Sequence, residues 1–338
     1  GCVRDDESDI PAQTSKEVLI TVKIPDAEMP STGRSMTEDQ ENVVQNIDLI
    51  IFDASDPSNE IFLEWARGVR ASQSGSNVTF TASLTPTEVM TRIVVVVNTD
   101  IESIVTGFIP NVTDKKTVME ALTYSTPGSS PSDWMWPADG KNYQAIPMYG
   151  EKLISQIKPQ MPHISGIMLT RMLARIDIVN STSAFIVEDV YLVNYNTAGY
   201  VASACEASTG QVIDPFPDDP LIPVARGKKT GYANAIRYEV NGEQRYEAEI
   251  YAYEAPAAVD DQNNNDASSR KDAVCLVIKG RNGSSGTSYY YHVVFTEENP
   301  ALPYTKYIEL RRNYKDIMEI EHVGGIGYAS VEEAVRSY

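Results

Sequence analysis

The sequence has few cysteines, few histidines and no long apolar run, and each shortage excludes a class of protein. Three cysteines among 338 residues are too few for a disulfide scaffold. The three histidines are far apart and complete none of the common metal or protease motifs. The apolar runs, such as Ile93 to Val97, are far shorter than the ~18 residues that span a bilayer. We therefore expect a globular chain that is not an enzyme and holds no metal or cofactor.

Positive charge is also scarce. Only 28 lysines and arginines stand against 47 aspartates and glutamates, which gives a formal net charge of -19. Because nucleic acids and anionic membranes select basic patches, we expect no nucleic-acid partner. The chain is instead rich in turn and strand formers, with 19 tyrosines, 19 prolines and 20 glycines. This composition indicates an acidic, all-β protein of the secreted or surface type.

Alternation of apolar and polar residues predicts strands along most of the chain. The clearest example is residues 17–24, where Val18, Ile20, Val22 and Ile24 share one face. The other predicted strands are residues 47–52, 61–65, 77–84, 93–97, 173–179, 186–193, 248–253, 273–278, 288–295, 307–310 and 317–323.

Three further patterns make specific structural predictions. The wholly apolar stretch Ile93 to Val97 predicts a central strand that is covered on both faces. Asp114 to Tyr124 has helical spacing, with Asp114 as the N-cap. Residues 330–333 form a capping box that would open a short terminal helix.

Many short strands, turns rich in proline and glycine, and few helices are typical of β-sandwiches. The length suggests roughly two domains, and the composition changes near residues 159–165. We expect a tether at residues 1–16, an N-terminal β-sandwich domain at 17–162 and a C-terminal β-sandwich domain at 163–338.

The cysteines differ in context. Cys2 lies at the start of the chain and precedes an acidic run at residues 5–9, a pattern typical of bacterial lipoproteins exported to the cell surface. We expect Cys2 to carry the lipid that anchors the precursor in the outer membrane, with an accidental terminal cysteine as the alternative. Cys275 lies in an apolar run and is expected to be a buried apolar residue. Whether Cys205 pairs with it stays open.

The most distinctive stretch is the C-terminal one. Residues 307–314 read YIELRRNY, and residues 324–334 read GGIGYASVEEA. Together they resemble the ending of Bacteroidales fimbrillins, the subunits of type V pili. Further agreeing segments occur in the same order at residues 41–52, 146–150, 169–178 and 253–256. One departure is that Tyr314 directly follows Asn313, where the family commonly has an extra residue or two, so the register of that strand is open.

The resemblance implies a structural subunit with two transthyretin-like β-sandwich domains. Family members are lipoprotein precursors that reach the outer-membrane surface and are incorporated into a fimbria. An Arg-specific surface protease removes their first strand, and a strand of a neighbouring subunit enters the vacated groove. The implied partners are therefore other fimbrial subunits, the protease, and the outer membrane through the lipid. Residues 17–24 match the removable strand.

Arg34 matches the cleavage site of the family, so Ser35 would be the new N-terminus. It lies in the segment PSTGRS, whose composition is typical of an exposed loop, between the first strand and the next. Arg67 and Arg70 are alternatives, but they follow a second predicted strand, and cleavage there would remove more of the chain. An ordinary loop arginine is the remaining alternative for Arg34.

The candidate donor strand is the C-terminal segment from Ile317 to the end of the chain. Met318 and Ile320 share one face of it, and Ile317 and Val323 lie on the other. This pattern is poorer than that of residues 17–24.

Other functions stay open from the sequence. Trp134 and Trp136, in a predicted loop, would form an aromatic platform if the chain were a surface lipoprotein that binds glycan or host protein. A β-sandwich hydrolase would need two carboxylates ~5–10 Å apart, and no motif marks such a pair. Stalk, tip and anchor roles also stay open, although a cleavable Arg34 favours stalk or tip.

Overall fold

A computed structural model describes residues 16–24, 41–125, 145–160, 163–203, 228–257, 272–297, 301 and 306–336. The first elements along the chain are β1 (Lys16–Lys23), β2 (Ile47–Asp53), β3 (Ile61–Ser74), β4 (Asn77–Leu84), β5 (Thr91–Val97), α2 (Glu102–Val105), α3 (Lys115–Ala121), β6 (Thr123–Ser125), β7 (Met148–Ile154), β8 (Ile164–Met168) and β9 (Thr170–Arg171). The next are β10 (Leu173–Asn180), β11 (Phe185–Val193), β12 (Tyr195–Asn196), β13 (Ala198–Tyr200), β14 (Lys228–Lys229), η2 (Tyr232–Asn234), β15 (Ile236–Glu239) and β16 (Arg245–Tyr253). The last are β17 (Cys275–Asn282), β18 (Tyr289–Val293), β19 (Thr296–Glu297), β20 (Lys306–Tyr307), β21 (Lys315–Ile320) and α5 (Val331–Arg336).

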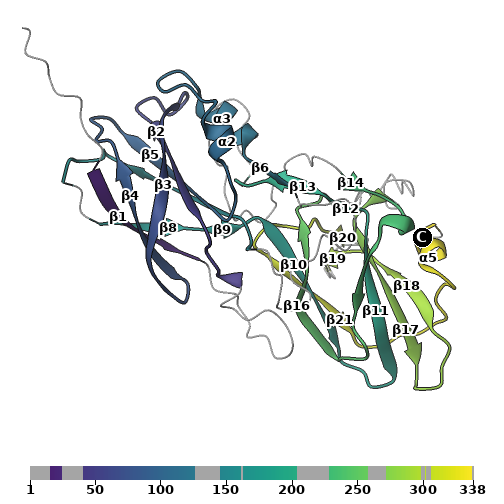
Figure 1. Cartoon of the computed structure of the whole chain (residues 1–338). Helices are drawn as coiled ribbons and strands as arrows, with labels where there is room; N and C mark the ends of the chain where they lie inside the picture. Colours follow the sequence, from purple (N-terminus) through teal and green to yellow (C-terminus); the bar gives the residue numbers. More distant parts are fainter. Residues whose placement is uncertain are drawn as a thin grey trace, which may run out of the picture.

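The predicted all-β class is confirmed. In the described part of the chain, the α-helices have only four, seven and six residues. The strands form two lobes that follow each other along the sequence (Figure 1). The first lobe is built on one eight-stranded sheet and the second on two smaller sheets.

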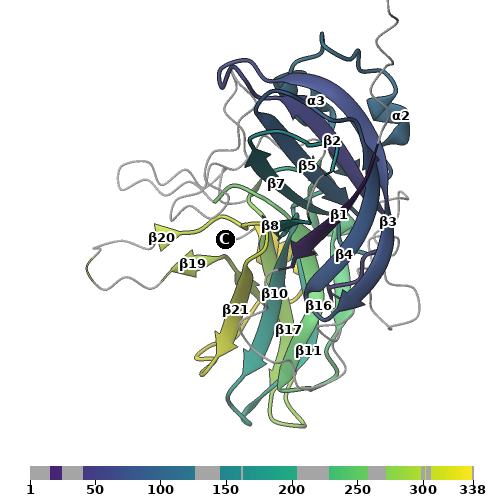
Figure 2. The ribbon, with the colours of Figure 1, turned by 90° about the vertical axis from the view of Figure 1, so that its left-hand side faces the viewer.

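The sheet of the first lobe has the order β8-β1-β4-β3-β2-β5-β7-β9. Its long strand β3 pairs with β2 up to Gly68 and with β4 from Val69 onward, so the sheet bends along β3 (Figure 2). A Cβ atom on Gly68 would lie 2.9 Å from the ring of Phe80, so this close approach needs a residue without a side chain. The bend brings β1 and β4 against β2 and β5 around a shared apolar core.

Strand β5 confirms the prediction for Ile93 to Val97, because all five residues are fully buried. Alternate residues face the core of the bent sheet, while Val94 and Val96 face a second cluster beneath α2 and α3. The predicted N-cap of α3 is also present, since the Asp114 carboxylate accepts a hydrogen bond from the Thr117 N–H at 2.9 Å. The helix ends at Ala121, before the predicted Tyr124.

The expected domain division at residues 162/163 falls just before β8. That strand pairs with β1, and Ile164, Ile167 and Leu169 belong to the core of the first sheet. Residues 164–169 thus pack with the first lobe, and β10 is the first strand of the second.

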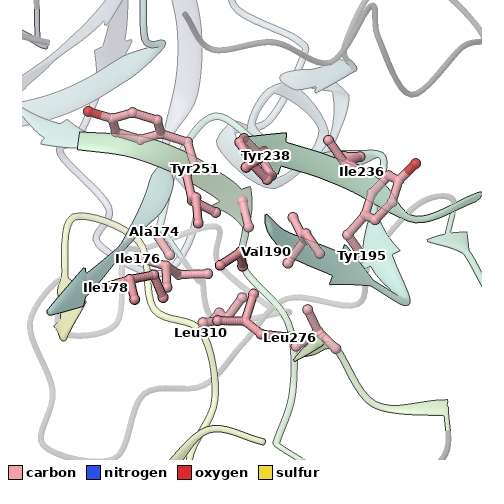
Figure 3. Close-up of a cluster of buried hydrophobic side chains, with 14 of the residues drawn as sticks. Ala174, Ile176, Ile178, Val190, Tyr195, Ile236, Tyr238, Tyr251, Leu276 and Leu310 are labelled. Carbon is pink, nitrogen blue, oxygen red and sulfur yellow. The ribbon is translucent and has the colours of Figure 1, made fainter. Parts of the chain in front are cut away.

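The second lobe pairs a three-stranded sheet, β16-β10-β21, with a four-stranded sheet, β15-β11-β17-β18. Side chains from both sheets fill one core, seen in Figure 3 with Ile176 of β10 and Val190 of β11 close together. The predicted terminal helix is present as α5. The Ser330 hydroxyl accepts from the Glu333 N–H at 3.1 Å, and Ala334 and Val335 cover Cys275.

Cys275 is fully buried, as predicted for an apolar role, and burial raises the pKa of its thiol to about 12. Cys205 lies outside the described residues.

The two lobes are joined by backbone pairing as well as by the chain. β13 of the second lobe pairs with β6 of the first, and Val201 and Ala202 enter the cluster beneath α2 and α3. The buried Arg312 guanidinium donates to the carbonyl oxygens of Tyr200 and Val201, each at 2.7 Å, and so holds this connection to the second lobe.

Candidate functional site

Strand β1 and the residue after it, Ile24, place the four side chains that the sequence assigned to one face in the core of the first lobe. Val18, Ile20, Val22 and Ile24 are 0–1% exposed. On the other face, Leu19 is 41% exposed, and Glu17 and Lys23 are exposed as well. The predicted strand and its faces are therefore confirmed.

β1 lies inside the sheet and has a partner on each side. It pairs antiparallel with β4 over its whole length, from Lys16↔Leu84 to Lys23↔Asn77. It pairs parallel with β8 at Ile20↔Ile164, Val22↔Ile167 and Lys23↔Met168. Loss of β1 would therefore open two strand edges at once, which is a liability that proteins normally avoid.

We call the space that β1 fills between β4 and β8 the β1 groove. Its apolar lining includes Val78 and Phe80 of β4 and Ile164 and Ile167 of β8. Burial of four aliphatic side chains is worth roughly 6–12 kcal/mol as an upper estimate. This is comparable to the whole stability of a typical domain, about 5–15 kcal/mol. A cut in the chain after β1 would therefore leave the strand bound by these contacts.

Several predicted sites lie outside the described residues. These are the tether with Cys2, the processing site at Arg34 and Ser35, and the loop with Trp134 and Trp136. The described chain stops at Ile24 and resumes at Glu41, so the predicted cleavage site falls between β1 and the first residue of the next described segment.

The alternative cleavage residues are placed by the structure. Arg67 and Arg70 both lie in β3, where Arg67 is paired with β2 and Arg70 with β4. Arg67 lies 3.5 Å from the buried Asp48, and Arg70 donates to the Val44 carbonyl at 3.2 Å. Cleavage at either position would require β3 to leave its sheet.

The segment after the predicted cleavage site is anchored in the second lobe by a buried polar cluster. Glu41 Oε1 lies 3.0 Å from the Arg175 guanidinium, which also binds Asp177 at 2.8 Å. Tyr251 donates its hydroxyl to the same Glu41 oxygen. All four side chains are buried. Arg171 lies beside them and donates hydrogen bonds to the side chains of Asn42 and Asn313. We call these seven residues the Glu41 cluster.

Electrostatics explains why this cluster is stable when buried. Burial alone would lower the pKa of the Arg175 guanidinium, but the hydrogen bond to Asp177 and the charge of Glu41 raise it above its usual value. Burial and the Glu41 charge together raise the pKa of Tyr251 well above the usual value, so its hydroxyl stays a donor. Glu41 and Asp177 share the one guanidinium of Arg175, so loss of that guanidinium would leave two buried carboxylates without an opposite charge.

The sequence did not identify this cluster. Its signal was the pair Arg175 and Asp177 inside the otherwise apolar strand β10, a pattern that indicates buried charges. The partner Glu41 is 134 residues from Arg175, and only the fold shows the contact.

The candidate donor strand is β21, which begins at Lys315 and ends at Ile320. It pairs parallel with β10 and has no second partner among the described strands. Ile320 is 8% exposed and faces the core of the second lobe, whereas Ile317 on the opposite face is 48% exposed. The expected grouping of Val323 with Ile317 is wrong, because the strand ends before Val323, which packs against the same core as Met318.

Asp316 makes β21 an imperfectly matched strand. Its Oδ2 atom is buried without a hydrogen-bond partner among the described residues. Burial raises the pKa of this carboxyl to about 6, with Arg311 lowering it and Glu309 raising it. A buried carboxylate of this kind weakens the docking of its strand at neutral pH.

The described residues show no group of three histidine, cysteine, aspartate or glutamate side chains that could hold a metal ion. Within the same residues, every helix is too short and too polar to cross a membrane.

No protein-family model matches the chain, and no curated protein matches it significantly. Solved structures do match. The tip fimbrial protein Mfa3 from Porphyromonas gingivalis, with a C-terminal truncation, is 15% identical at a TM-score of 0.49, over 91% of this chain and 96% of that one. A fimbrial assembly protein from Parabacteroides distasonis is 11% identical at a TM-score of 0.48, over 92% and 93% of the two chains. This chain is similar in fold to these fimbrial proteins, and similarity at this level assigns it no role.

Proposed function

We propose that this chain is a structural subunit of a cell-surface fimbria, with no enzymatic activity of its own. It is made as a lipoprotein with the lipid on Cys2, cut after Arg34 by an Arg-specific surface protease, and assembled by exchange of β1 for a strand of a neighbouring subunit. A stalk or tip position fits a chain that loses its lipid and first strand in this way.

One observation carries the proposal: β1 is an interior strand, yet a single cut between β1 and Glu41 would separate it from the rest of the fold. An incoming strand would have to replace four buried side chains and two rows of backbone pairs. Strand addition would satisfy the edges of β4 and β8 and the apolar pockets together.

The Glu41 cluster supports the same proposal. After cleavage behind Arg34, the new N-terminal segment would still be fixed at Glu41 by Arg175 and Tyr251. The cut would thus free β1 alone and leave β2 and the second lobe in place. Only six residues, SMTEDQ, would separate the new N-terminus from the anchored Glu41. Because most of them are polar, this segment could not take the place of β1 in its groove.

The test is to express the chain with Arg34→Ala in the bacterium that makes it and to analyse sheared surface fibres by immunoblotting and N-terminal sequencing. We expect the wild-type chain to appear in the fibres with Ser35 at its N-terminus and the Arg34→Ala chain to stay unprocessed and absent from them. Arg70→Ala is the matched control, and we expect it to be processed normally. Normal processing and incorporation of Arg34→Ala, or absence of the wild-type chain from fibres, would overturn the proposal.

A further inference from the structure

The β1 groove defines the strand that can fill it. Three of its four pockets face Ala82, Phe80 and Val78 of β4, opposite Val18, Ile20 and Val22 of β1. The fourth holds Ile24, whose N–H donates to the Ser76 carbonyl at 2.8 Å. An occupant must run antiparallel to β4 and present aliphatic side chains at four consecutive alternating positions.

The C-terminal segment of this chain offers no such face. One face of residues 316–323 carries Asp316, Met318, Ile320 and His322. The opposite face carries Ile317, Glu319, Glu321 and Val323. A shift of the first face by two residues places His322 and Gly324 in the groove. In each of these three registers, two of the four pockets receive a charged, polar or absent side chain.

The pockets do not tolerate such residues. Val18, Ile20, Val22 and Ile24 are 0–1% exposed, so a carboxylate in their place would be buried with no opposite charge. The described neighbours of these positions on β4 and β8 are aliphatic or aromatic, including Phe80, Ile164 and Ile167. A glycine would leave the volume of a whole aliphatic side chain empty.

β21 is also engaged in its own lobe. It forms six register pairs with β10, from Arg175↔Lys315 to Asn180↔Ile320. Beyond it, Tyr328 exchanges two backbone hydrogen bonds with Tyr290 of β18, at 2.7 and 2.9 Å. Insertion of β21 into the β1 groove of another copy would break these bonds, and the contacts that it gained there would be poorly matched.

We infer that the β1 groove accepts a strand from a different protein chain, one with four alternating aliphatic side chains, and not the C-terminal strand of a second copy of this chain. The inference rests on the proposed function, because it names the partner of the same groove. It makes this chain a subunit that joins a neighbour of another kind and does not form a homopolymer through β21.

The test uses the full chain cut once after Arg34 and a fluorescent peptide of residues 16–24, whose exchange into the chain is followed by anisotropy. Three unlabelled peptides compete: residues 16–24, residues 315–324, and residues 315–324 with Asp316→Val and His322→Val. The substituted peptide is the matched control, because it differs from the natural one only at the two positions that do not fit.

We expect the peptide of residues 16–24 to compete well and the natural C-terminal peptide to need roughly 100-fold more. The substituted peptide should recover to within about tenfold of the first. We also expect the cut chain alone to form no SDS-resistant ladder in unboiled gels. Equal competition by the natural C-terminal peptide, or a ladder from the cut chain alone, would overturn the inference and leave strand exchange standing. If even residues 16–24 fail to exchange, the inference and the proposed function fall together.

Discussion

The first and the last described strands of this chain are held in opposite ways. β1 lies between two partners, and its four inner side chains are 0–1% exposed. β21 pairs only with β10 among the described strands, and Ile317 is 48% exposed. On its inner side lies the Asp316 carboxylate, whose Oδ2 atom has no hydrogen-bond partner among the described residues. Both lie against the core of a β-sandwich lobe, so the difference comes from the match between side chains and pockets.

This difference bears on the strand exchange that we propose. A fully matched interior strand such as β1 gives a groove that discriminates among incoming strands, because each pocket rejects a polar or missing side chain. An edge strand with a buried carboxylate is held less firmly, because part of its burial energy is offset by the desolvated charge. Under the proposed exchange, selectivity would therefore lie at the β1 groove, and we expect β21 to be the more weakly docked strand.

The largest expected effect is at Arg175, which contacts the segment after the predicted cut and the residue before β21. Its guanidinium binds Glu41, which follows the predicted cut. Its backbone N–H donates to the carbonyl of Tyr314, just before β21, at 3.0 Å. Arg175→Met removes the cation and leaves Glu41 and Asp177 buried without it. We expect a loss of about 3–5 kcal/mol in the free energy of unfolding, measured by urea denaturation.

The matched control is Arg336→Met. Arg336 forms an ion pair with Glu332 at 2.6 Å, but its side chain is 73% exposed. Its removal should change the free energy of unfolding by less than about 0.5 kcal/mol. Equal effects of the two substitutions would show that the Glu41 cluster does not anchor the segment after β1.

The next effect compares two neighbouring residues of β1. Ile20→Ala empties a fully buried position opposite Phe80 and Ile164, and should cost about 2–5 kcal/mol of unfolding free energy. Leu19→Ala, at a position 41% exposed on the other face, should cost less than about 1 kcal/mol. Urea denaturation of both variants measures the difference. Similar costs would mean that β1 is not docked by its inner face.

How far the sequence predicts this molecule depends on the range of the interaction. The faces of β1, the two-sided burial of Ile93 to Val97 and the Asp114 cap follow from spacing within a few residues, and all three are confirmed. The strand predicted at residues 317–323 is observed at Lys315–Ile320, so its ends differ by two and three residues. The alternation of apolar residues in this segment does not favour one face, and the sequence therefore locates its ends poorly.

Contacts between distant segments could not be predicted in this way. The pairing of β8 with β1 moves residues 164–169 into the first lobe, and periodicity within either strand contains no information about its partner. The Glu41 cluster has the same origin. Charges in an apolar strand indicate that a partner exists, but only the three-dimensional fold brings Glu41 to Arg175.

The smallest effect tests whether β21 is weakened by its own carboxylate. Burial raises the native pKa of Asp316 to about 6, above the usual value of 3.8. Between these two pH values, the native state therefore holds a proton that the unfolded chain has lost. The stability from Asp316 is therefore fully present below about pH 4 and is lost as the pH rises through about 6. Asp316→Asn removes this titration and should stabilise the chain by about 1–2 kcal/mol at pH 7.5.

The pH dependence identifies the cause of that gain. Burial lowers the pKa of His292 to about 4, which gives the opposite trend, and raises that of Glu249 to about 7, which gives the same trend. Both groups are present in wild type and variant, so the difference in unfolding free energy between the two proteins isolates Asp316. That difference should shrink towards zero at pH 4.5. A difference that stays constant from pH 4.5 to 7.5 would mean that the charge of Asp316 does not weaken β21, and its weaker docking would then come from its position at the sheet edge alone.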